Sequence, residues 1–218
     1  MSLRQFTSKF LFFGAGYLLL SCLIHYVVFP EAQPQAEDFP RQGETLVNAE
    51  AGERVVFTKD RFHEDSNEVI IEVELAANGS VPLAHVHVNM NEVFTGITAQ
   101  TELRVNDTLH TLTTGQSIDI PAGTPHLPYN TSPTPSKVQV VMNPIGVFDL
   151  CLVNIHRTLS RPDDEQNWFS TQLQLSRYAY FCGVYHAGIP LWLQQAGLFF
   201  LDPTLRAMGY HAWKEVAP

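Results

Sequence analysis

Between residues 54 and 143 the sequence consists of short runs, apolar or alternating, separated by residues that favour turns. Residues 68–75 (EVIIEVEL) form one such run, and Asn78-Gly79 and Asn106-Asp107 are turn signals. Many short strands with frequent turns are typical of an all-β sandwich or barrel, not of strand–helix–strand units. We therefore predict a mainly β domain of antiparallel strands. The expected strands are residues 55–58, 68–75, 82–88, 92–98, 102–105, 108–112, 116–120 and 137–142.

Two histidines in the predicted strand 82–88 are separated by one residue. Because alternate residues of a strand project from the same face, the rings of His85 and His87 are expected to point the same way. Glu92 follows a short polar turn, so a hairpin brings its carboxylate beside the two rings. Two imidazoles and one carboxylate suit a divalent transition metal and leave coordination positions open. These residues are candidate metal ligands.

A fourth candidate ligand follows in residues 115–130 (GQSIDIPAGTPHLPYN). Pro121 fixes φ and Gly123 permits a positive φ, which is what a tight reversal between strands needs. His126 comes directly after this reversal, where its ring can complete the set. A barrel could also carry these four side chains without a metal. We predict a metal, because every one of the four positions holds a competent ligand.

The two segments together resemble the motifs of the cupin superfamily. The first motif is a glycine, five residues, His-x-His, three or four residues and a glutamate. The second is a glycine, five residues, Pro-x-Gly, two residues, a histidine, three residues and an asparagine. The first motif of the family ends with six residues and a glycine after the glutamate. This chain departs from it, because only three residues separate Gly96 from Glu92. The matching residues are Gly79, His85, His87 and Glu92 in the first motif, and Gly115, Pro121, Gly123, His126 and Asn130 in the second.

The resemblance covers residues 52–145 and implies an antiparallel jelly-roll barrel. It also implies one divalent ion (iron, manganese, nickel, zinc or copper) at the four ligand positions. Activities of such proteins include dioxygenation, isomerisation, decarboxylation and simple ligand binding, so the fold leaves the function open. We find no separate catalytic acid or base. Asn130 is interpreted as a turn-capping residue, Phe94, Tyr129 and Met142 as candidate pocket lining, and His63, His110 and His156 as surface or strand residues.

Residues 10–29 (FLFFGAGYLLLSCLIHYVVF) carry no formal charge. Twenty helical residues rise about 30 Å, the thickness of the hydrocarbon core of a bilayer. Arg4 and Lys9 precede the run and acidic residues follow it, which predicts a cytoplasmic N-terminus and a barrel on the non-cytoplasmic side. We expect an uncleaved single-pass anchor in contact with membrane lipid. A cleaved signal peptide and a lipoprotein site at Cys22 are the alternatives, although this run exceeds the usual length of a signal-peptide core.

Residues 181–201 are also apolar but contain Pro190, two glutamines and three glycines. A pair of helices broken near Pro190, lying on a membrane or packed on the barrel, fits this pattern better than a second span, which remains an alternative. A further helix is expected from Asp163 to residue 181. Cys151 and Cys182 either form a disulfide or stay as two buried thiols.

The predicted organisation is an anchor (1–30), a linker (31–50), a cupin barrel (51–146) and a mostly helical extension (147–218). A net charge of −9 without a cluster of lysines or arginines argues against nucleic-acid binding. The first function hypothesis is a membrane-anchored metal oxygenase or isomerase acting on a small oxygenated molecule in the barrel mouth. The second is a non-enzymatic ligand-binding or accessory module of a membrane assembly, with a homodimer or a membrane protein as candidate partners.

Overall fold

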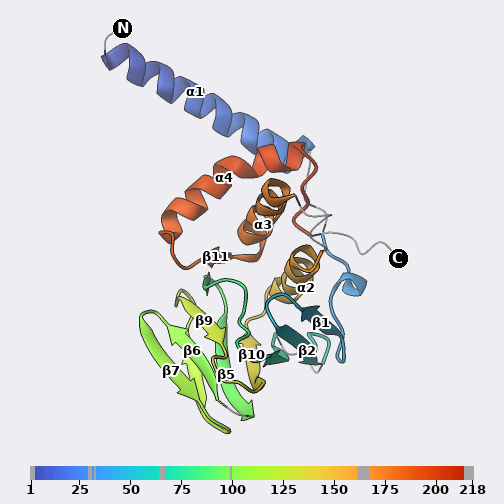
Figure 1. The fold of residues 1–218 in the computed structure, drawn as a ribbon. Helices are drawn as coiled ribbons and strands as arrows, with labels where there is room; N and C mark the ends of the chain where they lie inside the picture. Colours follow the sequence, from blue (N-terminus) through green and yellow to red (C-terminus); the bar gives the residue numbers. More distant parts are fainter. Residues whose placement is uncertain are drawn as a thin grey trace.

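The computed structural model describes residues 3–28, 31, 33–63, 67–98, 100–161 and 167–213. Within these residues, two antiparallel sheets form a barrel and the helices α2, α3 and α4 lie over one end of it. Helix α1 projects away from the rest of the molecule (Figure 1). The chain is thus a mainly β domain with helical additions.

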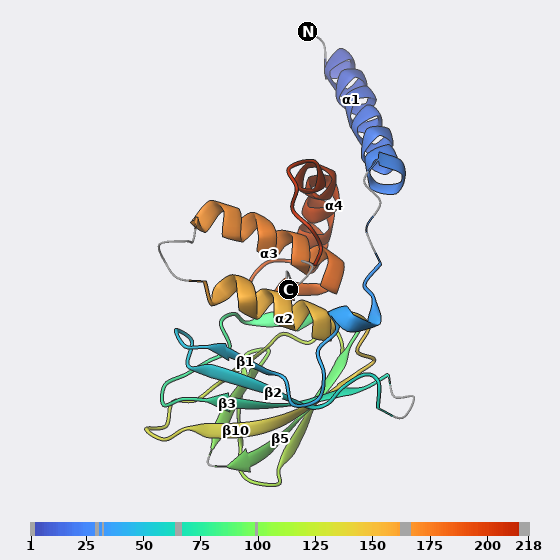
Figure 2. The same cartoon turned by 90° about the vertical axis from the view of Figure 1, so that its right-hand side faces the viewer.

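The larger sheet has six strands in the order β1-β2-β3-β10-β5-β8. Its strands form because apolar residues alternate along them. In β3, for example, Val69, Ile71 and Val73 are buried, whereas Glu72 and Glu74 are half-buried on the other face. Figure 2 shows β1, β2, β3, β10 and β5 side by side below α2. Their bounds are β1 (Thr45–Asn48), β2 (Glu53–Lys59), β3 (Val69–Leu75), β5 (Asn91–Thr98), β8 (Ser117–Ile120) and β10 (Ser136–Asn143).

The smaller sheet has five strands in the order β11-β4-β9-β6-β7. Apolar side chains from both sheets fill the space between them, including Phe57, Phe94, Leu103 and Met142. Phe94 and Met142 therefore belong to this core. The bounds are β4 (His85–His87), β6 (Thr101–Val105), β7 (Thr108–Leu112), β9 (His126–Tyr129) and β11 (Val184–His186).

Each of the eight predicted runs overlaps a strand, and three further strands lie outside them. Of these, β9 follows the reversal predicted at Pro121 and Gly123, whereas β1 and β11 lie where no strand was expected. The segment expected as a linker ends in β1, which pairs antiparallel with β2. Strand β11 lies in the C-terminal extension and pairs with β4. It follows Gly183, whose φ of 68° ends the preceding helix and turns the chain toward the sheet edge.

The C-terminal extension is mostly helical, as predicted. Helix α2 spans Phe148–Leu159, α3 spans Trp168–Cys182 and α4 spans Leu191–Ala207. The expected break near Pro190 is confirmed, because α4 begins directly after this residue. Asn167 caps the start of α3 by accepting a hydrogen bond from the Ser170 amide. Asp163, the predicted start of this helix, lies outside the described residues.

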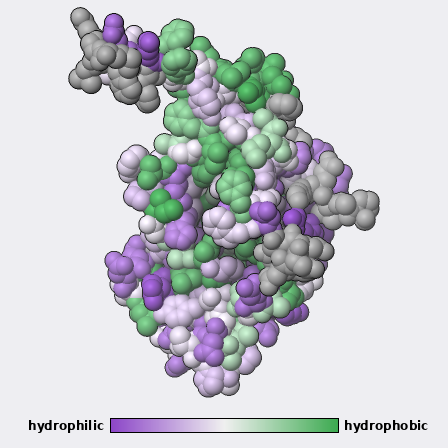
Figure 3. Space-filling model, turned by 45° about the horizontal axis from the view of Figure 1, so that its top comes forward, coloured by the Kyte–Doolittle hydropathy of each residue, from purple (hydrophilic) through white to green (hydrophobic). Residues whose placement is uncertain are grey.

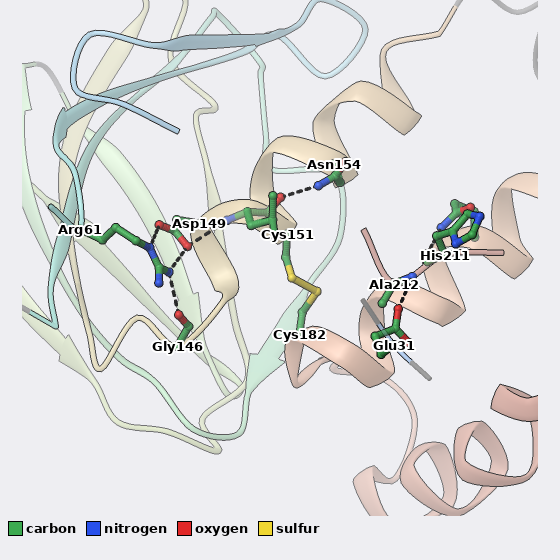
Figure 4. The surroundings of a disulfide bond; sticks show 11 residues. Glu31, Arg61, Gly146, Asp149, Cys151, Asn154, Cys182, His211 and Ala212 are labelled. Atoms are coloured by element: carbon green, nitrogen blue, oxygen red, sulfur yellow. Dashed lines mark hydrogen bonds and ion pairs between the residues drawn. A yellow bond between two sulfur atoms is a disulfide. The ribbon is translucent and has the colours of Figure 1, made fainter. Parts of the chain in front are cut away.

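A disulfide joins α2 to the end of α3 (Figure 4). It connects Cys151 with Cys182, which settles the alternative that the sequence left open. At the start of α2, the buried carboxylate of Asp149 accepts a hydrogen bond from the Nε of Arg61 at 2.8 Å. The disulfide thus links two helices of the layer to each other, and the Arg61–Asp149 pair links α2 to the segment after β2.

Removing the disulfide is expected to destabilise the helical layer. Cys151 and Cys182 are 31 residues apart, and closing a loop of that size stabilises a fold by roughly 2–4 kcal/mol. The double variant C151A/C182A should show this loss in a chemical denaturation curve. Cys22→Ala is the matched control, because Cys22 is exposed and unpaired. Equal midpoints for the double variant and the wild type would contradict the assignment.

A buried cluster of two arginines and two carboxylates connects α3, α4 and the segment after α1. Arg177 Nη1 lies 2.8 Å from Asp202 Oδ1, and Arg206 Nε lies 3.0 Å from Asp202 Oδ2. Both guanidinium groups also pair with Glu31. Arg177 is only 1% exposed, so water cannot solvate its charge. The carboxylates of Asp202 and Glu31 stabilise the charge instead.

Helix α1 spans Leu3–Leu23 and continues as a short π-helix, Ile24–Val28. The predicted span 10–29 is not confirmed: none of the helices in the described ranges has the length and apolar character that crossing a membrane requires. Helix α1 also starts before the apolar run and takes in polar residues such as Thr7 and Lys9. It contacts α4, where the hydroxyl of Tyr17 donates to the carbonyl of Phe200.

Candidate metal centre

The structure brings the four predicted ligands together between the two sheets. His85 and His87 lie on β4, and His126 lies opposite His85 on the neighbouring strand β9. Glu92 comes from β5 in the other sheet. The predicted hairpin was wrong, because β4 and β5 belong to different sheets and pair with other strands. The short connection between them nevertheless brings Glu92 beside the histidines, across the space between the sheets.

One potential ligand atom from each of the four residues lies within 4.8 Å of the others. Oε2 of Glu92 is 2.8 Å from Nε2 of His126 and 3.6 Å from Nε2 of His87. His87, Glu92 and His126 are buried, and His85 is half-buried. An ion placed among these atoms would thus reach solvent or substrate on the side of His85.

The hydrogen bonds of the histidines show that the site fits a cation. Nδ1 of His85 faces the carbonyl of Leu83 at 2.8 Å, and Nδ1 of His126 faces that of Thr124 at 3.0 Å. A carbonyl only accepts, so each Nδ1 carries the proton and each Nε2 keeps its lone pair. The Nε2 atoms of His87 and His126 and Oε2 of Glu92 are buried without a hydrogen bond of acceptable geometry. Such inward-facing acceptors are what a metal ion satisfies.

The turn after β8 places His126. Gly123 has a φ of 83° and donates its amide to the carbonyl of His87 at 2.7 Å. The Ala122 amide donates to the side chain of Asn91 at 2.9 Å. The reversal that Pro121 and Gly123 predicted is therefore hydrogen-bonded to the ligand-bearing strands of both sheets, β4 and β5.

Two further motif residues support the barrel instead of the ion. Asn130 is buried, and its side-chain amide donates to the carbonyls of Leu75, Ala76 and Thr134, which confirms its turn-capping role. Gly96 has no room for a side chain, because a Cβ would lie 2.3 Å from the carbonyl oxygen of Thr113. A glycine is therefore needed at this position, because the backbone of Thr113 lies too close for any side chain.

The pKa values of the four clustered residues shift in different directions. Burial lowers the pKa of His85 to about 3 and that of His87 to about 4, with the neighbouring imidazoles contributing. Burial alone would raise the pKa of Glu92, but His87, His126 and His85 lower it to about 2. Burial likewise opposes the charged form of His126, yet the Glu92 carboxylate leaves its pKa raised. Among the three histidines of the cluster, His126 is the one whose pKa is raised.

Metal affinity is therefore expected to depend on pH through His126. The ion and the proton compete for the same imidazole, and the pKa of His126 is raised. Below this pKa, affinity should fall by about tenfold per pH unit as the pH drops, and above it the affinity should level off. Competition titrations with Co²⁺ between about pH 6 and pH 9 measure this dependence. A constant affinity over that range would contradict it.

Some residues near the site carried no readable sequence signal. The ring of Phe148, the first residue of α2, lies 4.4 Å from the ring of His87. His156 was expected at the surface or on a strand, and this was wrong. It is buried on α2, where its Nε2 lies 3.0 Å from Oε2 of Glu53. A lone histidine without matched spacing could not reveal a partner 103 residues away.

Comparison with known proteins agrees with this geometry. A family model described as a cupin domain matches residues 71–142, from β3 to β10, and so includes all four clustered side chains. The match supports the assignment of the barrel to the cupin superfamily. It covers about one third of the chain, and the helices on either side lie outside it. No curated protein matches the chain.

Several solved structures are similar over the barrel. One is a sugar phosphate isomerase from a cupin superfamily, from Silicibacter pomeroyi, with 20% identity over 51% of this chain and 74% of that chain and a TM-score of 0.40. Another is a predicted oxalate decarboxylase from Thermotoga maritima, with 15% identity, 51% and 97% coverage and a TM-score of 0.41. A third is KdgF from Halomonas sp., with 15% identity, 49% and 93% coverage and a TM-score of 0.40. Similarities at this level carry no argument about activity.

Proposed function

We propose that this chain is a metal-dependent cupin that binds a small oxygenated molecule at its ion and acts on it as an oxygenase or isomerase. The observation that carries the proposal is the convergence of three imidazoles and one carboxylate in one buried cluster. His85, His87, Glu92 and His126 would hold a divalent transition metal, for which nitrogen and oxygen ligands of this kind are suited.

When bound, such an ion supplies Lewis-acid or electron-transfer chemistry. The protein's own residues orient its ligands and restrict access. The carbonyls of Leu83 and Thr124 hold the rings of His85 and His126 with Nε2 toward the cluster. Phe148 covers His87. Substrate access on the side of the half-buried His85 follows from this arrangement.

The test is the metal content of the purified full chain, followed by oxygen uptake with candidate phenols, thiols and keto acids. We expect one equivalent of a transition metal per chain and uptake of oxygen, or conversion of the substrate without uptake in the case of an isomerase. Absence of metal binding after incubation with Fe²⁺, Mn²⁺, Ni²⁺, Zn²⁺ and Cu²⁺ would refute the proposal.

We propose further that the chain attaches to a membrane, with the barrel on the non-cytoplasmic side. Supporting this are the exposed apolar side chains of α1, such as Leu11, Phe12 and Phe13, which are 69%, 77% and 71% exposed. The disulfide supports the location, because disulfides persist in oxidising compartments. Flotation of the full chain with phosphatidylcholine vesicles tests attachment. The variant F12S/F13S should float less, whereas Val47→Ser, at an exposed apolar residue of β1, should not change it.

A non-enzymatic accessory module is the second candidate. It is favoured by the apolar side chains that α4 leaves exposed, including Trp192 and Phe200, because a free-standing enzyme has no need of them. A chain that binds no metal and co-purifies with a single membrane protein would support this candidate over the first.

A further inference from the structure

A cavity of about 700 Å³ lies between the helical layer and the barrel. Residues from α2, α3, α4 and β11 line it, together with the segment that leads into β4. His85 is among its lining residues, so the cavity reaches the metal-ligand cluster. The volume lies within the range of roughly 300–1,000 Å³ that small-molecule sites have.

The chemistry of the walls restricts what the cavity can bind. Its apolar lining is mainly aliphatic and includes Leu152, Ile155, Leu175, Val184, Leu198 and Leu201. Over the described part of the chain, no lysine or arginine lines it. An anionic head group therefore has no cationic side chain to pair with, and Glu53 in the wall would repel it.

Several polar side chains in the wall already have partners within the protein. Glu53 pairs with His156 at 3.0 Å. The Gln194 amide donates to the carbonyl of His186 and accepts from its backbone N–H. Because these groups are satisfied, they do not call for polar atoms on a ligand. His85 differs, since its Nε2 belongs to the cluster.

We propose that this cavity binds an uncharged aliphatic molecule with a hydroxyl or carbonyl oxygen at one end, the chain lying between α2, α3 and α4 and the oxygen lying at His85. The inference rests on the proposed function for the role of that oxygen, whereas the binding of the chain stands on the cavity itself. Figure 3 shows hydrophobic side chains gathered over the helical half of the molecule, with mostly hydrophilic ones over the barrel. An aliphatic ligand would enter from that apolar side.

The first experiment titrates the full chain, loaded with Co²⁺, with hexanol, octanol and decanol in a calorimeter. Each additional buried methylene is expected to raise the affinity about fourfold, with saturation at one molecule per chain and a negative heat-capacity change. Affinity that does not grow with chain length would overturn the proposal.

Variants separate this cavity from other apolar surfaces. Gly197 lines the cavity on α4, and a Cβ built there meets nothing within 4 Å, so Gly197→Leu adds bulk without a clash. Ala179→Phe adds bulk to the lining from α3. Both should weaken decanol binding by about tenfold or more. Ala196→Leu adds the same side chain one residue away, outside the lining, and should bind decanol like the wild type. Equal weakening in all three variants, or in none, would refute the site.

The visible spectrum of the bound Co²⁺ tests where the oxygen lies. Decanol should change this spectrum in the wild type and should not change it in Gly197→Leu at the same concentration. Saturable decanol binding with an unchanged spectrum would overturn the placement of the oxygen at His85. A protein that binds decanol but no Co²⁺ would instead refute the proposed metal function and leave the aliphatic site standing.

Discussion

Replacing His87 with alanine or Glu92 with glutamine is expected to lower metal affinity by at least about 100-fold, since loss of an outer-shell partner alone costs about 10- to 100-fold. Both residues are buried and their Nε2 and Oε2 atoms have no hydrogen bond of acceptable geometry. Each atom is thus a candidate ligand whose hydrogen-bonding capacity the protein leaves unused. Chelator competition with Mn²⁺ and Co²⁺, together with the metal content of the purified variants, measures the loss.

His110→Ala is the matched control for this experiment, because His110 lies half-buried on the edge strand β7, outside the cluster. It should keep the wild-type affinity. Thermal unfolding of the metal-free proteins shows whether a variant has lost its fold instead of a ligand. Wild-type affinity in both H87A and E92Q, with the fold intact, would show that the cluster does not hold the ion.

Replacing Arg177 with methionine is expected to destabilise the protein by about 3–5 kcal/mol, because removing one partner of a buried ion pair leaves the other charge uncompensated. Arg177 is 1% exposed and pairs with Asp202, which is 2% exposed. In a chain of this size the loss lowers the melting temperature on the order of 10 °C. Differential scanning calorimetry measures it.

Arg54→Met provides the comparison for Arg177→Met. Its pair with Glu74 spans 3.9 Å, and the two side chains are 48% and 39% exposed. Solvent screens such a pair, so the variant should stay within about 0.5 kcal/mol of the wild type. Similar losses in both variants would show that the cluster around Arg177 adds nothing beyond an ordinary surface pair.

The barrel and its four converging side chains could be predicted because their signals are local. His85 and His87 share a face through strand geometry, and Pro121 and Gly123 mark the turn that delivers His126. The turn-capping role of Asn130 was also readable, and its three hydrogen bonds confirm it. These features depend on spacings of a few residues, which the order of the chain preserves.

The helices of the extension were predicted, but their packing over the barrel and the cavity beneath them could not be, because both depend on contacts between distant segments. Phe148 meets His87 only because α2 folds back over the barrel. Strand β11 has three residues, too few for a visible alternation. Glu53 and His156 show no pattern in common until β2 and α2 pack together. Long-range packing of this kind leaves no periodic trace in the sequence.

The origin of the ligands from both sheets has a mechanical consequence. Three histidines belong to the smaller sheet and Glu92 to the larger one, so an ion coordinated by all four side chains would link the two sheets. Removing such an ion with a chelator would break this link, while the apolar core between the sheets would stay packed. Amide hydrogen exchange should therefore become faster in β4 and β9 when the metal is removed and stay slow in β3 and β10. Local opening would then differ between the two sheets of one barrel.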